Sequence, residues 1–350
     1  MTDPLLDRVE IVGIGERDRD GDDTAFVAAH GAGETGWYGP VSDAVARAVG
    51  VLSAGAVGIA VTDHQHLPRR LRRAADSLAA DVAGWAVGAL DCALWDLHGR
   101  LAEQPVAALL APSRSPSAVP AYASWLRLDL RGPEAPGALA RVAEQGWALT
   151  KWGLRRHPGP STEAEAGALA EAVARTAGSI GGRFAVDAVG TWSPALAAAF
   201  ADAVDPSALV WLEDPLPAHD LDVYRHLSDA GIPVACGERL RLDEDPHPLL
   251  RQVRPAALTI DVVGCGGLTR AVDITSAARL AGVPVYPHGR SLVPGLHLAA
   301  AFPDAVPAVE FRLQWEPRRQ RLYAEPRTPR QGLIPAPEQA GLGTRPRRTQ

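Results

Sequence analysis

The sequence predicts an α/β protein whose main unit is a ring of parallel strands, each followed by a helix. Short apolar runs rich in β-branched and aromatic residues recur through the second half of the chain. Ala- and Leu-rich stretches with helical spacing separate them, as in parallel sheets that are covered on both faces. Each run also ends on a polar residue, at intervals of about 25 residues, the length of one βα unit. These residues are Asp187, Glu213, Glu238, Asp261, His288 and Glu310.

Eight strands are expected in this ring. The runs that predict them cover residues 119–125, 148–152, 183–187, 209–213, 232–238, 258–261, 283–288 and 308–310. Helices are expected between them, most clearly at 194–204 and 269–281. Eight βα units that close on themselves form a (β/α)₈ barrel, in which catalytic groups come from the carboxyl ends of different strands. The polar residues at the strand ends are therefore the first candidates for a functional site.

The chain is expected to have three parts. Residues 1–116 are interpreted as a separate α+β domain, residues 117–318 as the barrel, and residues 319–350 as a segment that returns to the first domain or trails into solvent. Within the first domain we expect strands at 8–14 and 24–30, a glycine-rich loop at 31–40, and helices at 41–52 and 76–110. Residues 81–101 carry an apolar stripe with helical spacing.

Composition excludes several classes of function. The chain has 350 residues, enough for a barrel and a smaller domain, and its net charge of −6 offers no electrostatic attraction to nucleic acid. No apolar run reaches the length of a membrane span, so neither nucleic acid nor a membrane is expected as a partner. The three cysteines show no pairing or metal spacing and no signal peptide is recognised, which predicts a reduced, cytoplasmic setting.

Three carboxylates at successive strand ends predict a metal site. Asp187, Glu213 and Glu238 would converge at one rim of the barrel and repel each other unless a cation lies between them. Ligation by oxygen alone favours a hard divalent ion, with Mg²⁺ the first choice and Mn²⁺ the second. The alternative is that each acidic residue caps the helix that follows its strand. That alternative is reasonable for one residue and weak for three in succession.

The next strand ends predict a general base. Asp261 and His288 lie on neighbouring strands, and a carboxylate held against one imidazole nitrogen raises the basicity of the other. Lys151 ends the second strand and would lie across the ring as a second base if a cation and burial lower its pKa. Glu310 ends the eighth strand and would act as an acid if its pKa is raised. Alternatively, His288 is a hydrogen-bonded structural residue and Lys151 a salt-bridge partner.

A metal flanked by two bases suits one reaction class. A substrate carboxylate bound to Mg²⁺ has a more acidic α-proton, and the metal stabilises the ene-diolate that forms when this proton leaves. The sequence therefore points to a small-molecule carboxylate as substrate.

Several motifs, in order and spacing, resemble the enolase superfamily and within it the mandelate racemase subgroup. They cover residues 89–100, 186–188, 211–216, 235–238, 261–268, 287–289 and 335–343. The resemblance implies a modified TIM barrel, (β/α)₇β, with an α+β capping domain built from the N-terminal region and the C-terminal tail. It also implies that the protein is a homo-oligomer.

The same resemblance implies roles for the residues already singled out. Mg²⁺ would be bound by Asp187, Glu213 and Glu238. His288 with Asp261 would be one base and Lys151 the base on the opposite face, while Glu310 would hydrogen-bond the substrate carboxylate opposite the metal. A mobile loop at about residues 30–40, carrying Trp37 and Tyr38, would close the mouth and contact the substrate.

Some positions depart from the pattern of the family. Leu149 stands where the family usually has the first lysine of Lys-x-Lys, which leaves Lys151 without the neighbour that helps to lower its pKa. Val189 replaces a frequent asparagine after Asp187. Trp152 and the extended loop that follows it, with Arg155, Arg156 and His157, are candidates for substrate contact or for a solvated surface, and Arg290 beside His288 has a stronger claim.

The expected reaction is dehydration of an acid sugar or related hydroxy acid to a 2-keto-3-deoxy acid, with protonated His288 as the acid. The alternative is racemisation or epimerisation of a 2-hydroxy acid or related carboxylate, which needs both bases and is disfavoured by Leu149. A second alternative is a catalytically silent barrel with a binding role, against which the full set of metal and base residues argues.

Overall fold

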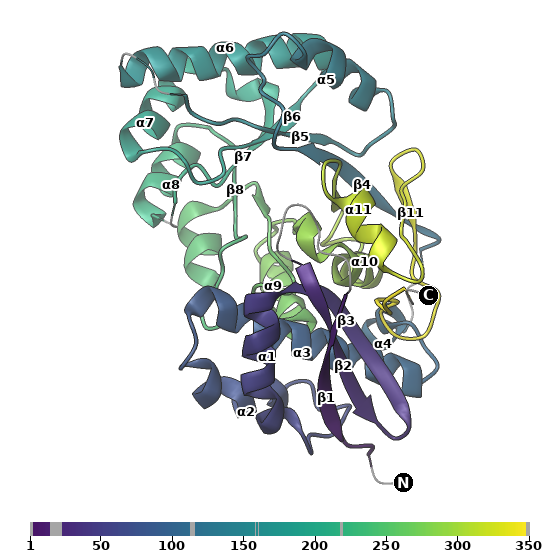
Figure 1. The fold of residues 1–350 in the computed structure, drawn as a ribbon. Coiled ribbons are helices and arrows are strands. Elements are labelled where there is room, and N and C mark those ends of the chain that lie inside the picture. The colour runs from purple at the N-terminus through teal and green to yellow at the C-terminus, as the bar shows by residue number, and fades with distance from the viewer. Residues whose placement is uncertain are drawn as a thin grey trace.

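The computed structural model describes residues 3–14, 23–112, 116–157, 159, 161–217 and 220–347. A barrel packs on a smaller domain formed by the first part of the chain, and the C-terminal tail lies between them (Figure 1). This arrangement confirms the predicted barrel with its capping domain.

The barrel strands are short and parallel. They follow the order β10-β4-β5-β6-β7-β8-β9, and their bounds are β4 Ala118–Trp125, β5 Thr150–Gly153, β6 Phe184–Asp187, β7 Leu209–Glu213, β8 Val234–Cys236, β9 Ala257–Leu258 and β10 Val309–Arg312. The strand expected at 283–288 is reduced to a single parallel bridge between Val285 and Leu258. Pro284 and Pro287 have no backbone N–H for a regular ladder. The segment still closes the ring, because Glu310 N–H donates to Pro287 O at 3.3 Å.

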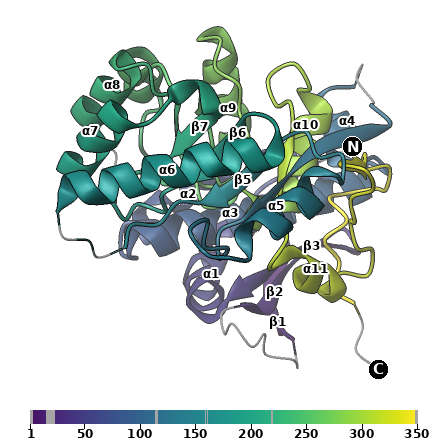
Figure 2. The same cartoon turned by 90° about the horizontal axis from the view of Figure 1, so that it is seen from above.

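Helices surround the barrel, as Figure 2 shows from above. Their bounds are α5 Ala135–Ala143, α6 Thr162–Ile180, α7 Pro194–Ala203, α8 Leu221–Asp229, α9 Leu268–Leu280 and α10 Leu292–Ala301, with a π-helix, η2, at Leu249–Val253 and 3₁₀ turns at η1 Pro206–Ala208 and η3 Gly289–Ser291. Ser161 and Ser193 cap α6 and α7 by accepting hydrogen bonds from the amides of Ala164 and Leu196. The helices expected at 194–204 and 269–281 are α7 and α9.

The capping domain is a three-stranded antiparallel sheet packed on helices. Its elements are β1 Arg8–Gly13, β2 Asp23–Gly31, β3 Glu34–Ser42, α1 Asp43–Ala56, α2 His66–Ala75, α3 Ala80–Leu101 and α4 Val106–Leu110. The helix expected at 76–110 is therefore two helices, α3 and α4.

The glycine-rich segment at 31–40 is not a loop, so the prediction of a mobile closing loop at 30–40 is wrong. Only Ala32 and Gly33 turn, both with positive φ, and the chain returns as β3 along β2. The glycines serve close packing instead. A Cβ at Gly36 would lie 2.3 Å from the carbonyl oxygen of Ala93 in α3, so glycine lets this strand lie directly on the helix.

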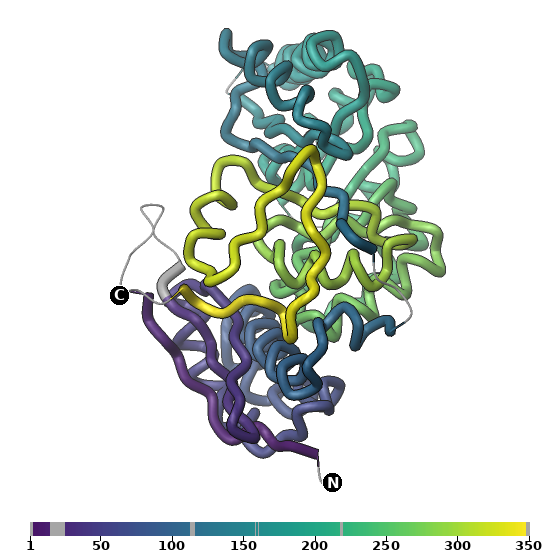
Figure 3. The backbone as a smooth tube through the Cα atoms, turned by 90° about the vertical axis from the view of Figure 1, so that its right-hand side faces the viewer, coloured from purple at the N-terminus to yellow at the C-terminus, as the bar shows by residue number. Residues whose placement is uncertain are grey.

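The C-terminal tail links the two domains (Figure 3). It contains α11 Glu316–Arg319, the 3₁₀ turn η4 Gln320–Leu322 and β11 Leu333–Pro335, which pairs antiparallel with β4. Tyr323 donates its hydroxyl to Gly39 O at 2.7 Å, and Leu342 N–H donates to Asp96 of α3 at 2.6 Å. The tail thus holds β3 and α3 in place; residues 348–350 lie outside the described part.

Side-chain alternation places the predicted site directly above an apolar layer inside the barrel. Tyr122, Ala185, Trp211, Ala235, Ala257 and Ala308 form this layer, with Leu149 and Tyr286 packed against it. Residues two positions further along the same strands point to the same side. Lys151 therefore lies above Leu149, Asp187 above Ala185, and Glu213 above Trp211.

His297 of α10 joins the tail to the capping domain and should make stability depend on pH. Its Nδ1 accepts from Ala107 N–H, and its Nε2–H donates to Leu342 O, both at 3.0 Å. Burial lowers the pKa of His297 from 6.5 to about 4, so its contribution to stability is full above pH 6.5 and is lost as the pH falls toward 4. We expect wild type to lose about 3 kcal/mol more than His297→Asn between pH 7 and 4. Urea unfolding at both pH values measures this difference, and parallel pH profiles would contradict it.

None of the helices in the described part of the chain combines the length and the hydrophobicity that a membrane-spanning segment requires.

Candidate active site

The strand ends meet at one mouth of the barrel. Asp187 is the register partner of Gly153 on one side and of Glu213 on the other, which places the ends of β5, β6 and β7 side by side. The polar side chains there are almost completely buried: Lys151, Asp187, Glu213, Asp261, His288 and Glu310. Glu238 is the exception, with 37% of its side chain exposed. The cluster is therefore shielded on most sides and reaches solvent near Glu238.

Lys151 is the centre of the buried charges. Its Nζ lies 2.9 Å from Oε1 of Glu213, 3.1 Å from Oε1 of Glu310 and 3.5 Å from Oδ2 of Asp187. Burial by itself lowers the pKa of Lys151, but the carboxylates of Glu213 and Glu310 outweigh it and hold this pKa well above its ordinary value. Lys151 is thus an ammonium ion in this arrangement.

The carboxylates carry more charge than Lys151 compensates. Burial raises the pKa of Asp187 to about 6, and it raises the pKa of Glu213 well above its usual range. Three buried carboxyl groups surround one ammonium, with Glu238 close enough to raise the pKa of Asp187 further. The ionised forms of Asp187 and Glu213 are therefore costly here, and a divalent cation would stabilise them.

The donor set fits the predicted ion in type. Asp187, Glu213 and Glu238 supply only carboxylate oxygens, which suits Mg²⁺. Among the described residues, no three His, Cys, Asp or Glu side chains are arranged as metal ligands, and the Lys151 ammonium lies against Asp187 and Glu213. The indole N–H of Trp211 orients Glu213 by donating to Oε2 at 2.9 Å.

Asp187 is held by a strained backbone. Its Oδ1 accepts from Val189 N–H at 2.7 Å, and Val189 has φ 54°. Positive φ is unusual for a β-branched residue. Because valine stands here in place of the asparagine that is frequent in the family, backbone strain lies directly beside a predicted metal ligand.

His288 and Asp261 form the predicted pair. Nδ1 of His288 lies 3.3 Å from Oδ2 of Asp261. The other carboxylate oxygen of Asp261 accepts from the amides of Val263 and Gly264, at 3.1 and 3.0 Å, and from the Ser291 hydroxyl. Burial alone would raise the pKa of Asp261, but the hydrogen bond from His288 and its charge keep this pKa below its usual value.

The free nitrogen of His288 faces two more carboxylates. Nε2 lies 3.7 Å from Oε1 of Glu238 and 3.7 Å from Oε2 of Glu310. Burial lowers the pKa of His288, but Glu238, Glu310 and Asp261 raise it to about 9 in total. His288 is therefore protonated at neutral pH in this arrangement and can donate a proton at Nε2.

Glu310 lies between the two candidate bases. Its Oε1 faces Lys151 and its Oε2 accepts from Gly289 N–H at 2.6 Å. Burial raises the pKa of Glu310, but the charges of Lys151 and His288 outweigh it and hold this pKa well below its ordinary value. The acid role requires a raised pKa, so this arrangement disfavours it. Glu310 is an ionised acceptor here.

The capping domain presses directly on the loop that carries Asp261. A Cβ at Gly84 or Gly88 of α3 would lie 2.2 Å or 2.0 Å from the carbonyl oxygens of Gly264 and Val263, so glycine permits this approach. Arg290 reaches the same helix, with Cζ 4.5 Å above the ring centroid of Trp85. Arg290 therefore lies between barrel and cap, beside His288.

The other residues that the sequence predicted to contact the substrate do not lie next to the buried charges at the barrel mouth. Trp152 is buried on the opposite side of β5 from Lys151, because successive residues of a strand alternate, and it packs in the core between the sheet and its helices. Tyr38 is 1% exposed within that same core. Arg155, Arg156 and His157 are exposed, and Arg155 lines a hollow of about 320 Å³ beside the loop 126–131.

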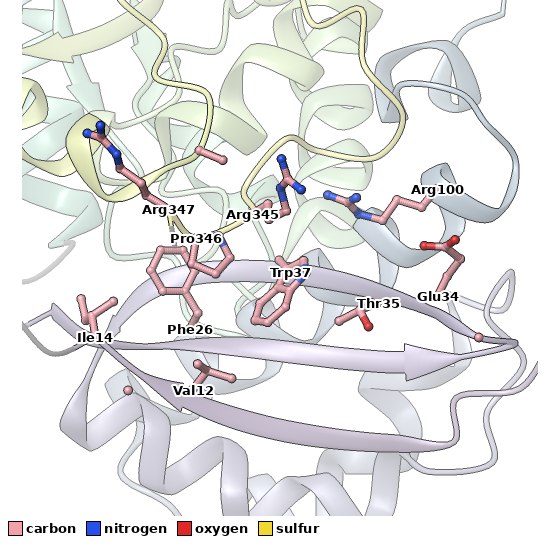
Figure 4. Close-up of a pocket in the computed structure, with 13 residues that line it drawn as sticks. Val12, Ile14, Phe26, Glu34, Thr35, Trp37, Arg100, Arg345, Pro346 and Arg347 are labelled. Carbon is pink, nitrogen blue, oxygen red and sulfur yellow. The ribbon is translucent and has the colours of Figure 1, made fainter. Parts of the chain in front are cut away.

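Trp37 faces a different hollow. It points from the capping sheet toward the tail, as Figure 4 shows, where Phe26, Arg345 and Pro346 line the same cavity of about 1040 Å³. None of the acidic cluster lines this cavity.

Three residues at the mouth were not predicted from the sequence. Ser124 is the last residue but one of β4 and lies beside Glu310, where its hydroxyl helps to lower the pKa of Glu310. Ser291 holds Asp261, as described above. Arg312 follows Glu310 by two residues on β10. Alternation along the first and last strands was the available signal for Ser124 and Arg312, whereas nothing local marks Ser291.

Family models match both domains. The mandelate racemase / muconate lactonizing enzyme N-terminal domain matches residues 28–111, and the enolase C-terminal domain-like family matches residues 135–350. The chain is 28% identical over 273 residues to D-galactarolactone cycloisomerase of Agrobacterium fabrum, covering 74% of this chain and 70% of that protein. It is 24% identical over 267 residues to arabinonate dehydratase of Saccharolobus solfataricus, covering 73% and 68%.

Solved structures share the fold. L-Talarate dehydratase from Polaromonas sp. JS666, in complex with Mg and L-glucarate, matches with a TM-score of 0.78 and 24% identity over 98% of this chain and 95% of that chain. The 3,6-anhydro-D-galactonate cycloisomerase from Zobellia galactanivorans matches with a TM-score of 0.79 and 22% identity over 97% and 96%. With both family models matched and the fold shared, the chain belongs to the enolase superfamily, in the mandelate racemase / muconate lactonizing enzyme family.

Proposed function

We propose that the protein is a Mg²⁺-dependent dehydratase that converts an acid sugar, or a related hydroxy acid, to a 2-keto-3-deoxy acid. The observation that carries this proposal is the position of Lys151 and His288 on either side of Glu310, next to Asp187, Glu213 and Glu238. The names of the two relatives, a cycloisomerase and a dehydratase of sugar acids, support the substrate class.

The cation would be held by Asp187, Glu213 and Glu238. When bound, Mg²⁺ would withdraw charge from the substrate carboxylate and so make its α-proton more acidic. Lys151 is held by two of these carboxylates, and a divalent cation beside them would lower its pKa by repulsion. Lys151 would then be able to accept a proton from the α-carbon.

His288 would act on the other side. The pair with Asp261 orients its ring so that Nε2 points to the space beside Glu310. In the reaction the Cα–H bond breaks toward a base, and the Cβ–O bond breaks as Nε2–H protonates the leaving hydroxyl. Water departs, and the resulting enol tautomerises to the 2-keto acid. If Lys151 remains an ammonium, His288 would serve as both base and acid, which requires that a cation beside Glu238 lowers the pKa of His288 and leaves its ring neutral before the α-proton is removed.

Two other outcomes use the same residues. Racemisation or epimerisation would follow if Lys151 and His288 exchange protons with opposite faces of the α-carbon. Cycloisomerisation of a sugar-acid lactone is favoured by the relative from Agrobacterium fabrum.

Incubation with Mg²⁺ and a library of sugar acids, their lactones and 2-hydroxy acids in D₂O distinguishes these reactions. The proposal expects a 2-keto acid as product. Deuterium at the α-carbon without a keto acid would indicate racemisation or epimerisation, and loss of lactone without net loss of water would indicate cycloisomerisation.

Metal binding is open to a separate test, which also addresses a catalytically silent barrel. We expect Mg²⁺ to raise the midpoint of thermal unfolding of wild type, because it would compensate the buried carboxylates, and we expect this shift to fall sharply in Glu238→Gln. Glu238 is the most exposed of the three, so the variant should fold. Glu244→Gln, an exposed acidic residue outside the cluster, is the control. Equal shifts in all three proteins would contradict the metal site.

A further inference from the structure

Arg312 is a nearly buried arginine at the barrel mouth. It follows Glu310 on β10, points to the same inner side and lies one step nearer the cap. Its side chain is 12% exposed. Its stem packs beside Gly289, where an added Cβ would lie 2.7 Å from Cγ of Arg312. Arg312 therefore flanks the turn that carries His288.

The guanidinium has few partners for its degree of burial. Its Nε is buried without a hydrogen bond. The nearest carboxylate oxygen, Oε2 of Glu316, is 3.8 Å from Nη2, and the ring centroid of Trp315 is 5.1 Å from Cζ. A guanidinium N–H that is buried without an acceptor is costly.

Arg312 has charges of both signs around it. Burial lowers the pKa of Arg312, Glu316 and Glu310 raise it, and Arg319 and Arg290 lower it further. Glu310 is already engaged by Lys151 and by the amide of Gly289. Three arginines, Arg312, Arg319 and Arg290, therefore face two carboxylates on the cap side of Glu310, which leaves a net positive charge for a further anion.

We propose that Arg312 binds an anionic group at the far end of the substrate, so that the preferred acid sugars carry a second negative charge. This inference rests on the proposed function. Nε and one Nη of a guanidinium match a carboxylate in a bidentate way, so a polyhydroxy dicarboxylic acid fits the site. A phosphate ester at the same end of the substrate offers the same chemistry.

The test compares kcat/KM for three six-carbon substrates: an aldonic acid, the matching aldaric acid and the matching 6-phosphorylated aldonic acid. We expect wild type to prefer one of the dianions. In Arg312→Gln the ratio of kcat/KM for the preferred dianion to that for the aldonic acid should fall by about 10- to 100-fold, the usual effect of hydrogen bonds to charged groups. Arg312→Lys keeps the charge and should retain part of the preference.

Arg127→Gln is the matched control. Arg127 also lies over the Trp315 ring, with Cζ 5.5 Å from its centroid, but it is exposed, so its replacement should leave the preference unchanged. A preference for the aldaric acid assigns a carboxylate to the site, and a preference for the phosphorylated acid assigns a phosphate. An equal loss on all three substrates in Arg312→Gln, or no preference in wild type, would overturn the inference.

Binding gives a readout independent of turnover. In the presence of Mg²⁺, tartrate should raise the midpoint of thermal unfolding of wild type more than glycerate does, and the difference should vanish in Arg312→Gln. Turnover of aldonic acids without any dianion preference would contradict only the role of Arg312. No turnover of any acid sugar, together with a tartrate-specific shift, would contradict the proposed function and leave the anion site standing.

Discussion

Replacing His288 by asparagine is expected to abolish most of the activity, with a loss in kcat of about 10²- to 10⁴-fold, the usual contribution of a general acid or base. Asparagine can still hydrogen-bond Asp261 but cannot transfer a proton. In this structure Nε2 of His288 lies 3.7 Å from both Glu238 and Glu310, so it is the proton donor nearest the proposed substrate position on that side. Keto-acid formation and α-deuteration, followed by NMR, measure the two halves of the reaction separately.

A graded series tests whether Asp261 acts through His288. Ser291→Ala removes one of the hydrogen bonds that hold Asp261 and should lower kcat less than His288→Asn does. His247→Asn, at an exposed histidine that contacts Asp245, serves as the control. Full activity of His288→Asn on every substrate found would remove His288 from the mechanism.

Replacing Lys151 by methionine is expected to have the largest effect on stability. Without the ammonium, Glu213 and Glu310 would be buried with no cation, and breaking a buried ion pair in this way costs about 3–5 kcal/mol. We therefore expect a lower free energy of unfolding in EDTA, and partial recovery on addition of Mg²⁺, because the metal would supply the lost positive charge. Urea unfolding with EDTA and with Mg²⁺ measures both effects.

The same variant separates the roles of Lys151. Lys151→Arg keeps a cation and should retain more of the stability in EDTA, but it cannot serve as a base because arginine stays protonated. If Lys151→Arg retains dehydration, His288 is base and acid together. If Lys151→Met unfolds at the same urea concentration as wild type in EDTA, the buried charges are not coupled as the distances indicate.

Much of the barrel could be predicted because its signals are local. Short apolar runs rich in β-branched residues are typical of strands in a parallel sheet that is covered on both faces. The spacing of about 25 residues between the ends of successive runs leaves room for one helix and two loops. Alternation then places Lys151, Asp187, Glu213 and Glu310 on the inner side of their strands. Even the weakest element, at 283–288, was recognised, although Pro284 and Pro287 reduce it to a single bridge.

Two errors share one cause. Trp37 and Tyr38 were placed in a glycine-rich loop, which the family resemblance identified as the mobile closing loop, and Trp152 was placed among the substrate contacts because it follows Lys151. In both cases long-range packing decided otherwise. Gly36 has no Cβ and therefore lets β3 lie directly on α3, and Trp152 fills the space between the sheet and the helices.

The sequence by itself determined the fold class and the set of polar residues at the barrel mouth, since both follow from periods along the chain. Only the tertiary structure decided how these residues pair. Lys151 against three carboxylates, Asp261 held from the loop beneath α3, and Arg312 beside Gly289 all join residues far apart in sequence or depend on which neighbours exclude water. Electrostatic energy depends on distance and burial in three dimensions, and neither quantity is encoded in spacing along the chain.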